Sequence, residues 1–565
     1  MAKLNQNDES KLNQNDESEL NQNDDKKFNI SVDIYSSAHG SELLGPRIFL
    51  VLVVGGCVVS HCQSSKLLIS FCVPGLERIA APLFRFREDR GDVVALVGYV
   101  VARCATGSAT ALDGELATPG VWAWICAEAR VLGRVLPESP PTFDKLRHLL
   151  DRVGSDLDDV LVLMQQAFTA EAFDIARSVG LCLQEGVGDL RFPVRENTMS
   201  ADGTWFKELS SVTVDPVTGD VRGSRSGGVK GTRAATTGGG GGVLQGPRVA
   251  EVLATRKGGK KLTGVPFVIA SVRGEGPLKR VVLGISRFRS PELGDHRSEM
   301  FAAMKLLKRV IAAADGGIGW CVYDMALTGT HLDQLGRVGV VGIAAMKAAA
   351  KAEEHLELDP SGPGPTRYNN DERKQLARRC AVKTLRHRVN GVWCDHALSG
   401  VDGALRVHPV SEPVSLHDPL CELERLVFVP AGSKGLDLVA TYRVPCPHTD
   451  SLFHDITLTG TVPGPSRKLM LNQIRPIHEY DEQFPKIKGW RQDSESVNST
   501  MKSRSHQWGR ATSLSNTKFE LDLLGNALLL NAQCWDEYVS QISQCAQRDA
   551  KIRASRARRV QATVD

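Results

Sequence analysis

The stretch 489–502 contains three charged residues whose spacing suits chemistry on phosphate groups. Arg491 and Glu495 are separated by three residues, and Glu495 and Lys502 by six. In a helix, Glu495 lies one turn after Arg491 and two turns before Lys502, so the three side chains share one face. A carboxylate that can bind a divalent metal would then lie between two cations that can bind phosphate. An ordinary ion pair between Arg491 and Glu495 on a surface helix is the alternative explanation.

Two upstream aspartates stand in settings that could complete a metal site. Asp202 lies in the string Ala-Asp-Gly-Thr, within an expected strand, and Asp324 ends the apolar run 318–324. Two Mg²⁺ (or Mn²⁺) ions held by carboxylates can activate the attacking oxygen and neutralise the leaving oxygen of a phosphodiester. Carboxylates clustered in this way repel, so at least one is expected to have a raised pKa. The alternatives are a turn role for Asp202 and a helix-capping role for Asp324.

The segments that contain Asp202, Asp324 and Glu495, taken in chain order, resemble the acidic motifs of a DDE transposase. The resemblance is to the insertion-sequence family whose last block reads Tyr-x2-Arg-x3-Glu-x6-Lys, with Lys488 here in the tyrosine position. It also rests on Asp-Gly-Thr beginning at Asp202 and on Tyr-Asp-x-Ala-x-x-Gly beginning at Tyr323. A β-rich insertion at 346–465, between the second aspartate and the glutamate, falls where this family commonly has one.

The resemblance implies an RNase H-like fold and metal-dependent cleavage and strand transfer at transposon ends. It makes Asp202, Asp324 and Glu495 the catalytic ligands of Mg²⁺ or Mn²⁺, and Arg491 and Lys502 contacts to DNA. The expected partner is double-stranded DNA, bound by a homo-oligomer without a membrane, in the cytoplasm and on the bacterial nucleoid. Two alternatives stay open: an RNase H-like nuclease that does not join DNA, and an inactive, decayed transposase that only binds it.

The order of the expected strands and helices that position these residues predicts a mixed α/β sheet with flanking helices. The first part of this core is expected at 198–345 and the second, with C-terminal helices, at 466–545. Hydrophobic periodicity indicates a long helix at 517–540. Strands are predicted at 265–272, 280–286, 318–324 and 340–344, and helices at 299–314 and 331–338.

The insertion contains short alternating runs that predict strands, and it also contains two Cys-x-His pairs. Cys394 with His396, and Cys446 with His448, together form a Cys2His2 set that could bind Zn²⁺ in tetrahedral geometry. Chance cysteines and histidines in a β-hairpin domain are the alternative. The strand-like runs lie at 404–407, 426–429, 438–442 and 456–461.

The flanking regions carry less information about chemistry. Residues 1–40 contain a repeated polar octamer, too poor in apolar residues to repay the entropy of ordering, and should be disordered. Residues 41–197 read as mostly helical in their second half. There, 169–180 fits either an ordinary helical hairpin or the first half of a DNA-binding helix-turn-helix. The tail 546–565 is basic, which suits a solvated end or a contact to nucleic acid.

Composition excludes few classes of protein. The chain has 565 residues, 42% of them hydrophobic, and a formal net charge of +4, so several globular domains are expected. Its 13 scattered cysteines suggest reduced thiols rather than a disulfide framework. The most apolar run, 48–59, is shorter than the roughly 20 residues that a membrane helix needs. It also follows a long acidic lead unlike a signal peptide, so neither export nor a membrane span is expected.

Overall fold

The computed structural model describes thirteen segments of the chain, and the prediction that 1–40 is disordered and the apolar run 48–59 lie outside them. The described residues are 61–207, 212–214, 221–223, 251–252, 263–276, 279–287, 299–346, 381–412, 414–415, 417–450, 452–462, 468–504 and 516–561.

A mixed β-sheet forms the centre of the protein, as the sequence predicted. The strands β6, β5, β1, β7 and β8 lie side by side in this order, and β4 pairs with the beginning of β5. β5 runs antiparallel to both β1 and β6, whereas β7 runs parallel to both β1 and β8. The strands are β1 (Thr198–Lys207), β4 (Glu251–Val252), β5 (Thr263–Arg273), β6 (Arg280–Arg287), β7 (Trp320–Val322) and β8 (Val341–Ile343).

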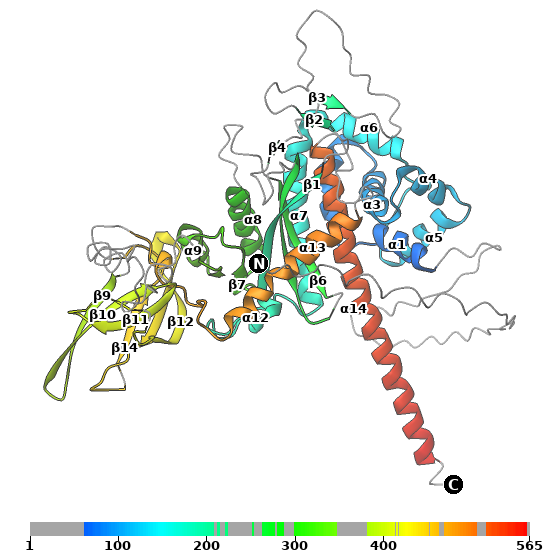
Figure 1. Ribbon diagram of the computed structural model, residues 1–565. Coiled ribbons are helices and arrows are strands. Elements are labelled where there is room, and N and C mark those ends of the chain that lie inside the picture. Colours follow the sequence, from blue (N-terminus) through cyan, green and yellow to red (C-terminus); the bar gives the residue numbers. More distant parts are fainter. Residues whose placement is uncertain are drawn as a thin grey trace, which may run out of the picture. The chain divides into compact units, whose positions relative to one another are not determined.

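Helices cover both faces of this sheet (Figure 1). Successive side chains of a strand point to opposite faces. In β1, a Cβ on Gly203 would point at α8 (Glu299–Ala314), whereas Phe206 packs against Phe519 of α14 (Asn516–Gln561), with ring centroids 5.3 Å apart. α13 (Arg491–Arg504) also packs on β1, beside its Asp202. α8 has the predicted bounds, but α14 extends well beyond the predicted 517–540, through most of the basic tail.

The outer strand β6 is covered by two helices. Asn531 of α14 accepts a hydrogen bond from the Val282 backbone N–H at 2.7 Å and donates one to the Val282 carbonyl at 2.8 Å. Its side-chain amide therefore takes the place of a neighbouring strand and closes part of the sheet edge. α7 (Leu157–Ser178) also packs against β6.

The N-terminal region is helical from its first described residue. This includes segments, such as α3, whose hydrophobic residues do not follow a clear helical period in the sequence. α3 packs on α14, where an ion pair joins Arg103 to Asp522 and Val100 lies close to Gly525. α3 is buried almost all round, which explains why an amphipathic pattern is missing from its sequence. The helices before α7 are α1 (His61–Phe71), α2 (Leu76–Ala80), α3 (Arg90–Thr106), α4 (Ala109–Ala117), α5 (Val121–Val131) and α6 (Phe143–Val153).

The helix-turn-helix interpretation is wrong. Residues 169–178 are the second half of α7, which is one continuous helix beginning at Leu157. Thr169, Ala172 and Phe173 are buried in the core, and only a short 3₁₀ turn (Gln184–Gly186) follows. This segment therefore lacks the recognition helix that a helix-turn-helix requires.

The predicted β-rich insertion is present, and its described part, from residue 381 on, contains two three-stranded antiparallel sheets (Figure 1). Arg337, at the end of α9 (Gly329–Arg337), pairs with Asp437 at 2.5 Å and so links the second sheet to the core. The hairpin β9–β10 was not predicted as strands. The first sheet contains β9 (Ala381–Val389), β10 (Val392–Val401) and β11 (Ala404–Pro409), and the second β12 (Glu422–Pro430), β13 (Leu436–Arg443) and β14 (Phe453–Thr457).

Within the described residues, no single helix is long and apolar enough to cross a membrane. One bent pair, Arg90–Thr106 with Ala109–Leu116, reaches the necessary length and hydropathy only when both helices are taken together.

Candidate functional site

The register between β1 and β7 places Asp202 and Asp324 at equivalent positions. Ser200 pairs with Val322 in parallel register, and each aspartate lies two residues beyond that pair. Asp202 lies within β1, whereas β7 ends at Val322 and Asp324 lies just beyond it. The Asp324 carboxylate still helps to raise the pKa of Asp202, so the two groups are close enough to interact. Asp324 Oδ1 also accepts a hydrogen bond from the Ala326 backbone N–H at 2.8 Å, so it caps the following turn as well.

Four polar side chains form a stripe along the face of α13 that lies on β1. Arg491, Glu495, Asn498 and Lys502 follow one another at helical spacing. Arg491 Nη2 donates to Glu495 Oε1 at 2.8 Å, so the ion pair foreseen as the alternative does form. Asn498 Nδ2 donates to Asp202 Oδ2 at 3.3 Å, which joins the helix to the first aspartate. The stripe therefore lies over Asp202, while the Glu495 side chain keeps 51% of its surface exposed.

The pKa of Asp202 reflects its burial and the charges around it. It is raised from 3.8 to about 6, chiefly by burial; the Arg491 guanidinium lowers it, and the carboxylates of Asp324, Glu299 and Glu495 raise it. The expectation that one acid of the cluster has a raised pKa is thus confirmed, with burial as the largest cause. The other two predicted acids and a further one, Glu299, all act on Asp202 electrostatically, and we refer to these four residues as the acidic site.

Glu299 is a member of this site that sequence reasoning missed. It is the first residue of α8, and its Oε1 accepts a hydrogen bond from the Tyr323 hydroxyl at 3.0 Å. Burial raises the pKa of Glu299, and the hydrogen bond from Tyr323 opposes this shift. A Cβ at position 203 would approach Glu299 Oε1 to 2.4 Å, so Gly203 leaves room for this carboxyl group against the strand next to Asp202. The glycine after Asp202 was the available signal, but nothing in the sequence linked it to residue 299.

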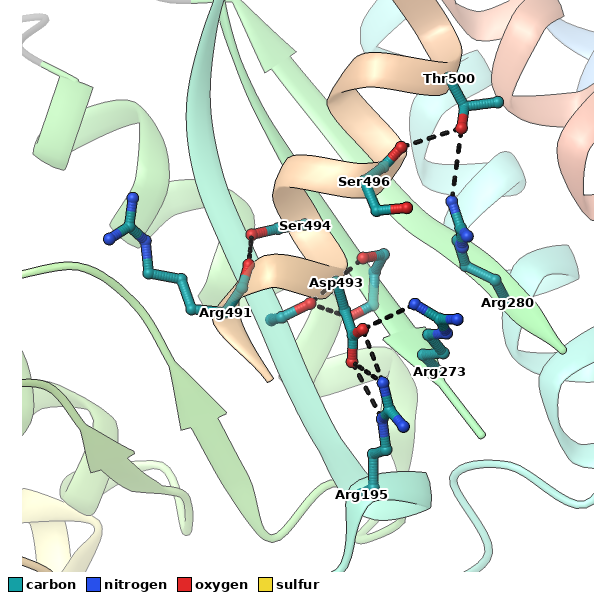
Figure 2. Close-up of polar contacts among 10 residues, drawn as sticks. Arg195, Arg273, Arg280, Arg491, Asp493, Ser494, Ser496 and Thr500 are labelled. Atoms are coloured by element: carbon teal, nitrogen blue, oxygen red, sulfur yellow. Dashed lines mark hydrogen bonds and ion pairs between the residues drawn. The ribbon is translucent and has the colours of Figure 1, made fainter. Parts of the chain in front are cut away.

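A second cluster fixes the first turn of α13. The buried Asp493 accepts hydrogen bonds from Arg195 Nη2 at 2.7 Å and from Arg273 Nη1 at 2.8 Å (Figure 2). Arg195 precedes β1 and Arg273 ends β5, so these three residues, which we call the anchor cluster, hold the helix to two strands. In Figure 2, Arg491 points away from this cluster.

Lys502 does not lie beside the aspartates. Its Nζ is 6.0 Å from the centroid of the Phe206 ring, and Phe206 lies four residues beyond Asp202 on β1. At about 3.3 Å per residue, this places the contact roughly 13 Å along the strand from Asp202. Lys502 therefore continues the polar stripe rather than lining the acidic site.

Three of the four predicted zinc ligands lie together in the insertion. One ligand atom each of His387, Cys394, His396 and Cys446 lies within 4.8 Å of the other three. His387 takes the place predicted for His448, whose Nδ1 instead lies 3.1 Å from the Cys394 sulfur. Among the described residues this is the only such group, so the oxygens of the acidic site are not as close together.

The acidic site contains carboxylate oxygens, the kind of ligand that Mg²⁺ and Mn²⁺ prefer. Burial is the largest cause of the raised pKa of Asp202, and the neighbouring carboxylates add to it. No protein-family model matches the chain, and no curated protein is significantly similar to it.

Proposed function

We propose that this protein is a DNA transposase with an RNase H-like core. In this proposal Asp202, Asp324 and Glu495 bind Mg²⁺ or Mn²⁺, and the substrate is double-stranded DNA at the ends of a mobile element. The observation that carries the proposal is the placement of Asp202 on β1 and of Asp324 just after the neighbouring parallel strand β7, with α13 joined to Asp202 through Asn498.

The topology of the sheet supports the RNase H-like assignment. β5 lies between β1 and β6 and is antiparallel to both, and β7 and β8 continue the sheet in parallel on the other side of β1. The acids come from the first strand, from the end of the parallel strand beside it and from a late helix. This is the order of acidic residues that the resemblance to DDE transposases implies.

Each residue of the site has a defined part in the proposed reaction. A bound divalent metal would activate the attacking oxygen and stabilise the leaving oxygen of the phosphodiester. Asn498 orients the Asp202 carboxylate, and Tyr323 orients Glu299, through the hydrogen bonds described above. Arg491 offers its guanidinium to a phosphate beside the acids, and Lys502 lies further along the path that a DNA backbone would follow. Joining two element ends requires a homo-oligomer on DNA.

The test is cleavage of a supercoiled plasmid that carries the DNA flanking the gene, with Mg²⁺ or Mn²⁺. We expect Glu495→Gln to reduce cutting at least about 100-fold, because it removes a metal ligand without changing the shape of the side chain. Glu77→Gln, at an exposed position of α2, is the matched control and should cut as the wild type does.

The products separate the remaining possibilities. Inserted plasmid species identify a transposase, whereas cut but unjoined DNA identifies a nuclease. Equal cutting by the wild type and Glu495→Gln would refute the metal-ligand assignment. DNA binding without cutting by any variant would indicate a decayed protein that only binds DNA.

A further inference from the structure

The insertion contains a compact group of soft metal ligands that takes no part in the proposed phosphodiester chemistry. We refer to His387, Cys394, His396 and Cys446 as the Cys/His cluster. One ligand atom of each residue lies within 4.8 Å of the others. Cys394 and Cys446 are both buried free thiols.

The β9–β10 hairpin supplies three of the four residues through its register. Asn390 and Gly391 form a two-residue turn with φ of 49° and 84°, the left-handed geometry that suits a tight hairpin. This turn places His387 directly opposite Cys394. His396 lies two residues further along β10 and therefore shares their face of the sheet. The His387 and His396 rings are stacked, with centroids 5.1 Å apart.

The fourth residue comes from the other sheet of the insertion. Cys446 follows β13, in a turn closed by a hydrogen bond from the Thr449 backbone N–H to the Cys446 carbonyl. Its sulfur lies 3.4 Å from Nε2 of His387. The cluster thus joins the two three-stranded sheets, whose described strands do not pair with each other.

Two buried ring nitrogens of the cluster make no hydrogen bond to any described residue. They are Nδ1 of His387 and Nε2 of His396. A buried polar atom left without a partner costs on the order of 1–3 kcal/mol. A cation shared by the imidazoles and thiols offsets such a cost, because imidazole nitrogen and thiolate sulfur are both strong zinc ligands.

We propose that His387, Cys394, His396 and Cys446 bind one structural Zn²⁺ ion that links the two sheets of the insertion. Two thiolates and two imidazoles form a complete tetrahedral set with no open position for substrate. On binding, each cysteine thiol releases its proton to solvent, and each histidine donates the lone pair of one nitrogen. His448 contacts Cys394 from outside this set. This zinc site does not depend on the proposed transposase activity.

The first test measures the zinc content of the full-length protein, purified without a metal-binding tag. Elemental mass spectrometry should find about one zinc per chain. If the protein has none and takes up none from an equimolar zinc solution, the proposal is wrong.

The second test identifies the fourth ligand with paired variants. His387→Ala should lose the zinc, and His448→Ala should retain it. The opposite result would overturn this ligand set in favour of the two Cys-x-His pairs. His417→Ala and Cys545→Ser change exposed residues of the same types and should both keep full zinc content.

The third test uses the unaltered chain, so misfolding of a variant cannot confuse it. Cys394 and Cys446 should resist alkylation until a zinc chelator is added, and peptide mass spectrometry would then find both modified. The exposed Cys545 should react from the start. Labelling of Cys394 and Cys446 before chelation, or recovery of a disulfide between them, would contradict the zinc site.

Discussion

Helix α13 separates two regions in which carboxylates have opposite surroundings. In the anchor cluster, Asp493 is buried between Arg195 and Arg273, so its charge is fully compensated within the protein. In the acidic site, burial and the repulsion from three other carboxylates raise the pKa of Asp202. Arg491 is the cation that acts on Asp202 there.

The difference shows why residue type alone does not reveal function. A compensated buried carboxylate stabilises the fold, and removing it leaves buried cations without a partner. A group of carboxylates that outnumbers its cations is poorly stabilised by the protein itself and gains most from a bound cation. We therefore expect substitutions in the anchor cluster to act mainly on stability and those in the acidic site mainly on activity.

The largest effect is expected from Asp324→Asn. Loss of a metal ligand should reduce metal-dependent DNA cleavage by about 1,000-fold, or about 4 kcal/mol in activation free energy. The asparagine oxygen can still accept the hydrogen bond from Ala326, so the urea unfolding curve should not change. A large loss of stability in this variant would break the distinction between the two regions.

The next largest effect is expected from Asp493→Asn. This change leaves Arg195 and Arg273 partly buried without a counter-charge and should lower the free energy of unfolding by about 3 kcal/mol. Urea unfolding measures it. Glu495→Gln, two residues further along the same helix, breaks only an exposed ion pair and should cost less than about 1 kcal/mol. Equal losses for the two variants would contradict the comparison.

The pH dependence of stability should identify the raised pKa of Asp202. Because this pKa is higher in the folded chain than its ordinary 3.8, the folded protein binds the proton more tightly than the unfolded one. In metal-free buffer, the free energy of unfolding should therefore fall as pH rises from about 4 through about 6. We expect Asp202→Asn to remove a fall of about 2 kcal/mol. An identical pH profile for the wild type and this variant would refute the shift.

The smallest effect is expected from Asn498→Ala, which changes only the orientation of Asp202. Loss of this hydrogen bond should reduce cleavage about 10-fold. It should also raise the Mg²⁺ concentration needed for half-maximal rate, which a purely structural role would not do. Ser499→Ala, at the exposed next position, should cut normally. An unchanged metal requirement in Asn498→Ala would show that the bond does not position the ligand.

Local patterns in the sequence determined much of the mixed α/β architecture. The apolar stripe of α8 predicted its bounds, and alternating or apolar runs located β5, β6, β7 and β8 to within a few residues. Such patterns reflect the period of a single element, which depends on residues close together in the chain. For the same reason, the helical spacing of Arg491, Glu495 and Lys502 was enough to place them on one face of α13.

Contacts between distant segments were decided only by the tertiary structure. The approach of Glu299 to Gly203, the bond from Asn498 to Asp202 and the pairing of Asp493 with two arginines join residues from separate elements. Spacing along the chain contains no information about such pairs. For His387 the sequence did contain a signal that was not used: Asn390–Gly391 is a typical two-residue hairpin turn, and its register places His387 opposite Cys394.

The sequence by itself therefore determined which residue types were available for chemistry and which helix or strand carried most of them. Tertiary structure decided which carboxylates are paired with arginines and which lie near other carboxylates, because both depend on distances across the sheet. It also decided that 169–178 is the buried end of α7 rather than half of a DNA-binding motif, since burial depends on what packs against a helix.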